Sequence, residues 1–195
     1  MALYFHTAGR IHVLFDVSRA PRVGAMNAWR YCPQCGAGLG EAALGGLPRQ
    51  VCSAGCGFVH WGNPAPVVAA LVELVDRDGH VVLARNQAWA PGAFGLITGF
   101  LEREEDPAQA VLREVKEELD LDADAATLIG VYPFARKNEV LIAYHVAARG
   151  TIRLNEELAE FRLVAPDRLK AWDYGTGLAV ADWLARRQGR PGRLP

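Results

Sequence analysis

The sequence has no apolar run long enough to cross a bilayer. A membrane-spanning helix needs about 20 apolar residues, whereas the longest run here, from Pro64 to Val75, is shorter and contains Glu73. Strong charge of either sign is also missing, because the formal net charge is −1 over 195 residues. This balance gives no electrostatic case for a dedicated nucleic-acid or membrane binder.

The first 25 residues have neither a basic start nor a clean apolar core, so they do not predict a secretory signal, and we expect a cytoplasmic protein. We interpret residues 1–25 as a poorly ordered extension, or as a start assigned upstream of Met26. The sequence has 51% apolar residues, which is enough for a globular protein with a core. Its length fits one domain with a small appendage.

Only four cysteines are present, and all fall in one window, as the pairs Cys32–Cys35 and Cys52–Cys56. Two close pairs separated by a glycine-rich spacer are typical of a structural zinc ribbon with four thiolate ligands. The alternative is two disulfides, which the missing secretory signal disfavours. Because the second pair is spaced by three residues, His60 remains an outside candidate ligand beside its more ordinary role as a packed histidine.

A stiff Gly-Asn-Pro-Ala-Pro break at residues 62–66 marks a domain boundary. We therefore predict a zinc ribbon over residues 30–62 and a second domain over residues 64–188. Gly36 and Gly57 each follow the second cysteine of a pair, where a tight turn favours glycine.

The second domain alternates extended and helical patterns. We predict strands over residues 67–75 and 80–86, joined as a hairpin, an extended stretch at 95–102, and a central strand at 140–148. A C-terminal helix is predicted over residues 177–187.

The segment from Gly99 to Leu121 concentrates eight acidic residues in 23 positions. Asp106 followed by Pro107 predicts the start of a helix. Its apolar stripe is formed by Ala108, Leu112, Val115 and Leu119.

Glu114 and Glu118 stack beside that stripe at a spacing of four residues, and Glu117 lies a third of a turn away. A solvated acidic face is the ordinary interpretation of such a cluster. Carboxylates placed next to a core stripe fit better with a hard divalent cation, which needs several carboxylate oxygens at close range.

The same segment resembles the box motif of the Nudix family, in which a glycine and a glutamate precede an Arg-Glu-apolar-any-Glu-Glu-any-Gly-apolar run. The matching residues here are Gly99, Glu105 and the run from Arg113 to Leu121. One position differs, because Asp120 stands where the family has glycine. Asp tolerates the left-handed backbone of a helix end, so we expect a small cost in stability and no loss of chemistry.

The resemblance implies an α/β class fold, an α/β/α sandwich with a mixed sheet, and Mg²⁺-dependent (or Mn²⁺-dependent) hydrolysis. Glu114 and Glu118 would be the main metal ligands and Glu117 a further one, with the Thr98 carbonyl as an additional candidate. Glu105 and Arg113 would orient the cluster.

Many family members use one more glutamate from a downstream loop. Glu157 is our first candidate for this catalytic and metal-binding role, and Glu160 is the second. The alternative is a solvated helix start in this segment.

A cysteine module before a Nudix domain is similar to the NADH pyrophosphatase-like branch of the family. That branch has a Ser-Gln-Pro-Trp-Pro-Phe-Pro run, of which residues 130–140 share only Pro133 and Phe134, so NADH specificity does not carry over. Tyr132 and Phe134 would either stack on a base or pack in the core. The same two alternatives apply to Trp89 and Phe94.

We therefore expect hydrolysis of a pyrophosphate bond in a nucleoside diphosphate derivative such as NAD(H), ADP-ribose or FAD. The partner would be a small nucleotide, with a capped RNA end as the one nucleic-acid candidate, and a homodimer is expected from the resemblance. The alternative is a non-catalytic ligand sensor, or a module whose zinc ribbon binds RNA or protein.

Overall fold

A computed structural model describes residues 29–190 of the chain. The predicted extension over residues 1–25 lies outside this range. The chain divides into a smaller unit that ends at Gly62 and a larger unit that begins at Asn63. Within the described residues, no helix is long and apolar enough to span a membrane.

The smaller unit is a three-stranded antiparallel sheet in the order β1-β2-β3. Its strands are β1 (Leu39–Leu44), β2 (Leu47–Cys52) and β3 (Val59–His60). Gly36 and Gly57 have φ angles of 74° and 92°, so both glycines occupy left-handed turns as predicted.

The larger unit contains a six-stranded mixed sheet in the order β7-β8-β4-β5-β9, with β6 paired to β4. The strands are β4 (Ala65–Leu74), β5 (His80–Asn86), β6 (Ile97–Phe100), β7 (Asp122–Phe134), β8 (Glu139–Arg149) and β9 (Leu158–Val164), and a short 3-10 turn, η2 (Ala135–Lys137), joins β7 to β8. β4 and β8 run parallel along their whole length, while the other pairs are antiparallel. The predicted central strand is β8, which is paired on both sides.

The predicted hairpin of β4 and β5 forms only at its turn, where Glu73 pairs with Val81 and Leu74 with His80. Beyond that point β5 departs from β4, because β6 occupies the same edge of β4 from Val67 to Ala70. The strands therefore diverge, and Ala84 of β5 pairs instead with Gly95, in the connection that leads into β6.

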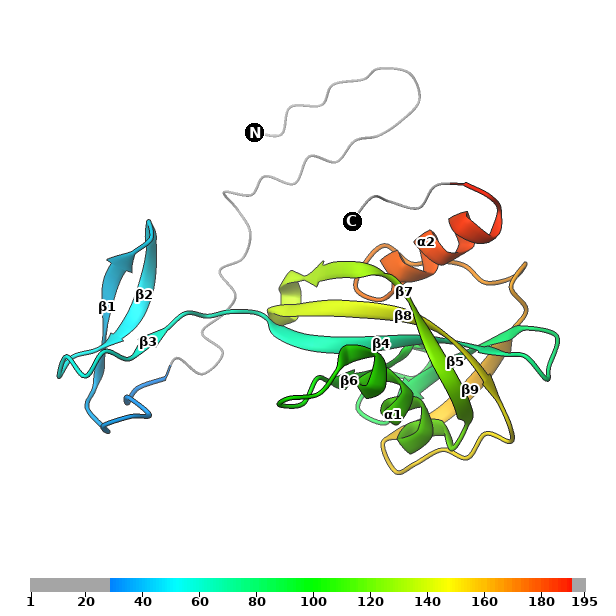
Figure 1. Ribbon diagram of the computed structural model, residues 1–195, viewed down its shortest axis with the longest axis horizontal. Helices are drawn as coiled ribbons and strands as arrows, with labels where there is room; N and C mark the ends of the chain where they lie inside the picture. Colours follow the sequence, from blue (N-terminus) through cyan, green and yellow to red (C-terminus); the bar gives the residue numbers. More distant parts are fainter. Residues whose placement is uncertain (1–28, 191–195) are drawn as a thin grey trace, which may run out of the picture. The chain divides into compact units, whose positions relative to one another are not determined.

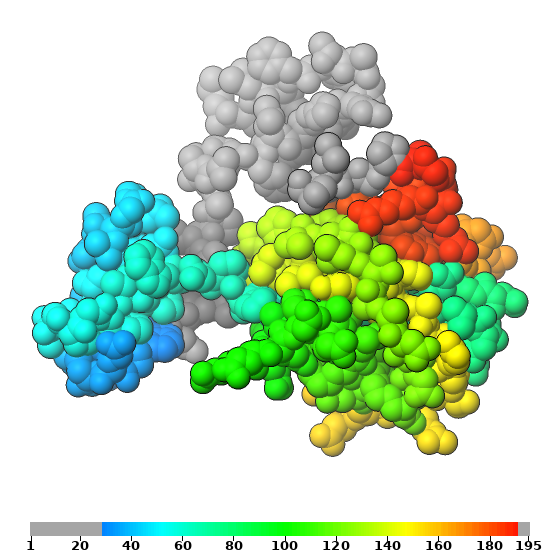
Figure 2. Space-filling view, viewed as in Figure 1, coloured from blue at the N-terminus to red at the C-terminus, as the bar shows by residue number. Residues whose placement is uncertain are grey.

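Two helices cover opposite faces of this sheet (Figure 1). Alternate β4 residues from Val68 to Leu74 pack against α1 (Pro107–Leu119), and the intervening ones from Val67 to Leu71 pack on the side of α2 (Gly177–Arg187). Both helices lie at the surface, α1 in green and α2 in red, with the lime and yellow strands between them (Figure 2). The predicted α/β/α sandwich is confirmed.

Some local expectations need correction. The most buried apolar face of α1 consists of Ala110, Val111, Val115 and Leu119, whereas the predicted Ala108 and Leu112 are only partly buried. The segment proposed as an alternative helix start is a turn leading into β9, so that interpretation is wrong. Neither β7 nor β9 was predicted.

Candidate functional site

The four cysteines meet in the smaller unit, where their sulfur atoms all lie within 4.8 Å of one another. Cys32 Sγ is 3.5 Å from Cys56 Sγ, and Cys35 Sγ is 3.4 Å from Cys52 Sγ. A disulfide would bring two sulfurs to about 2.05 Å, whereas four thiolates around zinc lie about 3.8 Å apart. The donor set and its dimensions fit a structural zinc ion.

Backbone N–H groups of Ala37, Cys56 and Phe58 donate to the thiols of Cys35, Cys52 and Cys56. Without a metal, the hydrogen bonds shared among the thiols still raise the pKa of Cys35 and of Cys56. The N–H of Cys56 lowers the pKa of the Cys52 thiol to about 6, with further hydrogen bonds from the neighbouring thiols. His60 does not join the cluster, since its ring stacks on Trp29 with centroids 5.4 Å apart. It is the packed histidine of the two alternatives.

The second cluster is built on α1, whose ends the sequence defines closely. Asp106 Oδ1 accepts hydrogen bonds from the N–H groups of Ala108 and Gln109, at 2.8 and 3.2 Å, and Pro107 occupies the first turn. At the other end, Asp120 adopts the left-handed conformation with φ 55°. The replacement of the family's glycine by Asp therefore preserves the helix end, as expected.

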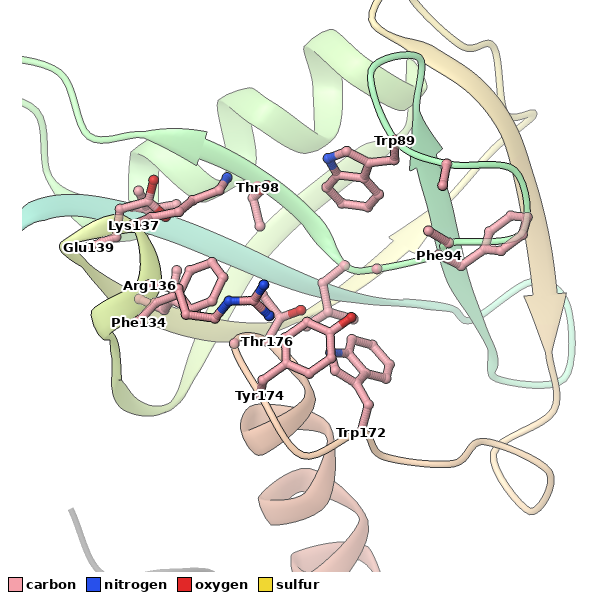
Figure 3. A pocket seen from close by; sticks show the side chains of 17 residues that line it. Trp89, Phe94, Thr98, Phe134, Arg136, Lys137, Glu139, Trp172, Tyr174 and Thr176 are labelled. Atoms are coloured by element: carbon pink, nitrogen blue, oxygen red, sulfur yellow. The ribbon is translucent and has the colours of Figure 1, made fainter. Parts of the chain in front are cut away.

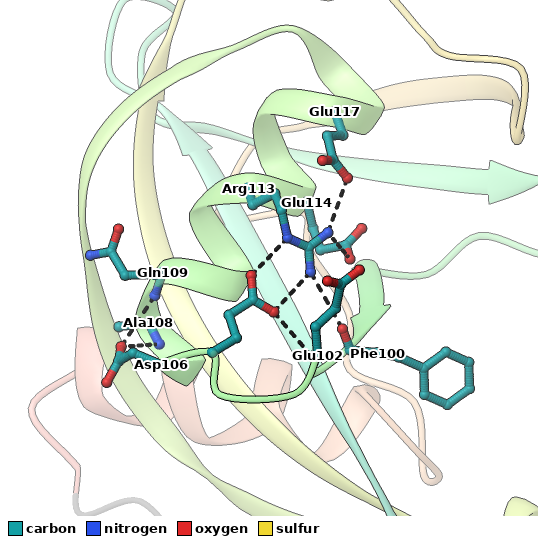
Figure 4. A network of polar contacts seen from close by, with 9 residues as sticks. Phe100, Glu102, Asp106, Ala108, Gln109, Arg113, Glu114 and Glu117 are labelled. Carbon is teal, nitrogen blue, oxygen red and sulfur yellow. Dashed lines mark hydrogen bonds and ion pairs between the residues drawn. The ribbon is translucent and has the colours of Figure 1, made fainter.

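Arg113 is the centre of a carboxylate network (Figure 4). Its guanidinium binds both oxygens of Glu105, at 2.7 and 3.1 Å, and donates to Glu114 at 2.8 Å and to Glu117 at 3.0 Å. Glu105 also accepts from the N–H of Glu102. These hydrogen bonds, from Arg113 above all, lower the pKa of Glu105 and keep it ionised. One cation thus holds three carboxylates in fixed positions.

Gly99 allows Glu114 to approach β6. A β-carbon on Gly99 would lie 1.9 Å from Cδ and Oε1 of Glu114, far inside van der Waals contact. The Glu114 carboxylate therefore occupies the space that the side chain of any larger residue at position 99 would need. This close approach explains the glycine at the start of the motif.

Glu118 is the most buried acid of the cluster, with 6% exposure. Among the described residues, none donates a hydrogen bond or forms an ion pair to its carboxylate. Burial raises the pKa of Glu118 to about 8, and the charges of Glu114 and Glu157 add to the shift. Burial also raises the pKa of Glu114. A buried carboxyl group without a protein hydrogen-bond or ion-pair partner, close to two other acids, fits a site where a divalent cation would replace the proton.

The two downstream candidates differ in their surroundings. Glu157 is close enough to Glu114 and Glu118 to affect the pKa of both carboxyls. Glu160 instead accepts from Arg85 Nε at 2.6 Å. Of the two downstream candidates, only Glu157 shifts the pKa of Glu114 and Glu118.

A cavity of about 520 Å³ lies on the α2 side of the sheet (Figure 3). Its aromatic walls come from Trp89, Phe94, Phe134, Trp172 and Tyr174, and Arg136 and Lys137 supply positive charge. Thr98 lines the cavity, and the next residue of β6, Gly99, faces Glu114. Since successive strand residues point to opposite faces, the cavity and the acidic cluster flank the same short strand.

Residues 64–183 match the NUDIX domain family, well over half of the chain. The chain belongs to the Nudix family. The matched range contains the acidic helix, all of the sheet and most of α2, and it begins after the cysteine cluster.

Two curated bacterial relatives, both named NAD-capped RNA hydrolase NudC, are similar to this Nudix protein. The protein from Stutzerimonas stutzeri is 29% identical over 167 residues, covering 83% of this chain and 58% of that protein. The protein from Vibrio atlanticus is 30% identical over 128 residues, covering 65% and 45%. The chain spans about half the length of these relatives.

Two solved structures share this architecture. The NUDIX hydrolase from Nitrosomonas europaea aligns with a TM-score of 0.68 at 25% identity, over 84% of this chain and 96% of that one. The E. coli ORF135 protein aligns with a TM-score of 0.55 at 26% identity, over 66% and 94%.

Tyr132 and Phe134, the two aromatic candidates for base stacking in residues 130–140, have different surroundings. Tyr132 is 6% exposed, and its hydroxyl donates to Asp182 at 2.8 Å, so base stacking is wrong for this residue and core packing is observed. Phe134 lines the cavity with Trp89 and Phe94.

The sequence did not mark several residues of the cavity wall, among them Arg136, Lys137, Trp172 and Tyr174. They follow β7 or precede α2, and no local motif marks them. The only available signal was the density of aromatic and glycine residues at positions 172–177.

Proposed function

We propose that this protein is a divalent-metal-dependent pyrophosphohydrolase acting on a nucleoside diphosphate linked to another group. The observation that carries this proposal is the acidic cluster on α1, in which Glu118 is buried and Glu114 is held by Arg113. A cavity with aromatic walls lies on the other side of β6. The names of the relatives support NAD-linked substrates, including an NAD-capped RNA end.

Glu114, Glu117, Glu118 and Glu157 would hold Mg²⁺ or Mn²⁺. When bound, such an ion neutralises pyrophosphate charge and lowers the pKa of attacking water. Arg113 keeps Glu105, Glu114 and Glu117 in fixed positions, which lowers the reorganisation required during reaction.

The cavity would hold the base and position the linked phosphates. Trp89 and Tyr174 offer ring faces for a planar base, while Arg136 and Lys137 provide positive charge for phosphate oxygens. The cavity and the cluster lie on the two sides of β6, so a nucleotide seated in the cavity would extend past the edge of this short strand to place its pyrophosphate near Glu114.

The test is hydrolysis of a substrate panel by full-length, zinc-loaded protein with Mg²⁺ and with EDTA. The panel contains NADH, NAD, ADP-ribose, FAD, diadenosine polyphosphates, nucleoside triphosphates and a short NAD-capped RNA. Metal-dependent cleavage of one dinucleotide, free or at an RNA end, well above the other substrates supports the proposal. No cleavage of any substrate by folded protein contradicts it and favours the ligand-sensor alternative.

A further inference from the structure

The segment that carries Glu157 is fastened to the C-terminal end of α1. The N–H of Asn155 donates to the carbonyl of Glu118 at 3.2 Å, and the N–H of Arg153 donates to the carbonyl of Leu119 at 2.9 Å. Asn155 Oδ1 in turn accepts from the N–H of Glu157 at 3.0 Å. A single asparagine therefore connects the backbone of Glu118 with that of Glu157.

The same segment is bound on its other side to the connection between β5 and β6. The N–H of Gln87 donates to the carbonyl of Glu157, and Gln87 Nε2 donates to the carbonyl of Glu156, both at 2.8 Å. Gln87 is two residues before Trp89, whose N–H donates to Asn86. The Glu157 backbone thus lies between the acidic helix and the loop that carries a cavity wall.

Arg85 holds the connection between β5 and β6 in place through two contacts. Its Nε binds Glu160 at 2.6 Å and its terminal nitrogen donates to the Trp89 carbonyl at 3.3 Å, with the Arg85 side chain only 17% exposed. Glu160 is therefore engaged in holding the loop, which leaves Glu157 as the acid that faces the cluster.

We propose that Asn155 is a positioning residue, which holds Glu157 against the end of α1 so that the Glu157 carboxylate completes the cation site of Glu114 and Glu118. Its side-chain oxygen fixes the Glu157 N–H, while its own N–H fixes the distance to Glu118. Gln87 fixes the opposite side of the Glu157 peptide and so joins the cation site to the Trp89 wall of the cavity. The inference rests on the proposed function, since it takes the acidic cluster as a cation site.

The test measures Mn²⁺ binding to the full zinc-loaded chain, by the electron paramagnetic resonance signal of free Mn²⁺. The variants are Asn155→Ala, Glu157→Gln and the double variant, with Asn63→Ala as the matched control, because Asn63 is exposed and lies outside the cluster. Residues that orient metal ligands typically contribute about 10-fold or more to metal affinity. We therefore expect Asn155→Ala to weaken Mn²⁺ binding about 10-fold and the control to leave it unchanged.

Non-additivity separates positioning from a general structural effect. If Asn155 acts through Glu157, the double variant binds Mn²⁺ no more weakly than Glu157→Gln alone. Asn155→Asp keeps the acceptor oxygen, so it should bind Mn²⁺ as tightly as wild type or more tightly. Asn155→Leu has no acceptor oxygen, so it should bind Mn²⁺ more weakly. This pair tests the proposal even if Asn155→Ala fails to fold.

Wild-type affinity in Asn155→Leu, or fully multiplicative losses in the double variant, would overturn the proposal. A wild-type chain that binds Mn²⁺ but hydrolyses nothing in the substrate panel would overturn the proposed function alone.

Discussion

Replacing Gly99 by alanine tests whether the close approach of Glu114 to β6 is needed for activity. The new β-carbon would lie 1.9 Å from Cδ and Oε1 of Glu114. Ordinary contact begins at 3.4 Å, so the carboxylate must withdraw by about 1.5 Å, the difference between these two distances. Mg²⁺ binds oxygen at about 2.1 Å in a demanding octahedral geometry and does not tolerate such a displacement.

A misplacement of about 1 Å in a catalytic group costs on the order of 100-fold in rate, which corresponds to about 2.7 kcal/mol of transition-state stabilisation. We expect at least this fall in kcat for Gly99→Ala, and weaker Mn²⁺ binding. The fold should persist, because Gly99 is in an extended strand without a positive φ angle, where alanine is not strained.

The assay compares kcat, Mn²⁺ affinity and melting temperature for Gly99→Ala and wild type. Gly40→Ala is the matched control, since Gly40 is also in a strand and its added β-carbon would meet nothing within 4 Å. Activity of Gly99→Ala within about threefold of wild type would contradict this prediction, because Glu114 would then function from another position.

Two further predictions concern the charged clusters. Glu118 has a pKa of about 8 in the metal-free fold, against 4.5 as its ordinary value. The folded state therefore binds more protons than the unfolded state between these values, and metal-free stability should fall as pH rises from about 5 to 8. Urea unfolding of the larger unit in the zinc-loaded chain, without added Mg²⁺ or Mn²⁺, checks this, and saturating Mn²⁺ should remove the slope; a rise in stability over this range without added metal would contradict it. Cys32→Ser should abolish stoichiometric zinc binding and unfold the smaller unit while the larger unit keeps its own unfolding transition, as measured by metal analysis and calorimetry. Full zinc retention in that variant would contradict the four-thiolate site.

The acidic helix could be predicted because its information is local. Asp106 and Pro107 mark its beginning, and the spacing of Glu114 and Glu118 places both acids beside the core. The depth of burial was not predictable from spacing alone. It depends on packing of α1 against β4 and β6, which turns Val111 and Glu118 inward and leaves Leu112 at the margin.

The cavity could not be predicted because its residues meet through topology. Trp89 follows β5, Arg136 follows β7, and Tyr174 precedes α2, so their proximity depends on pairings between distant strands. β7 also escaped prediction, since its register with β8 shifts twice and its burial pattern does not alternate regularly. Tyr132 lies in that strand, and only its packing against α2 decides that it belongs to the core.

The decisive measurement for the catalytic metal site is the activity of Glu118→Gln on the best substrate of the panel, with saturating Mg²⁺. Glutamine keeps the size of the side chain and removes the charge, so we expect a fall in kcat of several orders of magnitude. Zinc content and melting temperature should be retained, since no hydrogen bond or ion pair to this carboxylate occurs within residues 29–190. Near-wild-type turnover in a folded, zinc-loaded Glu118→Gln protein would contradict the assignment of the acidic cluster as the catalytic metal site.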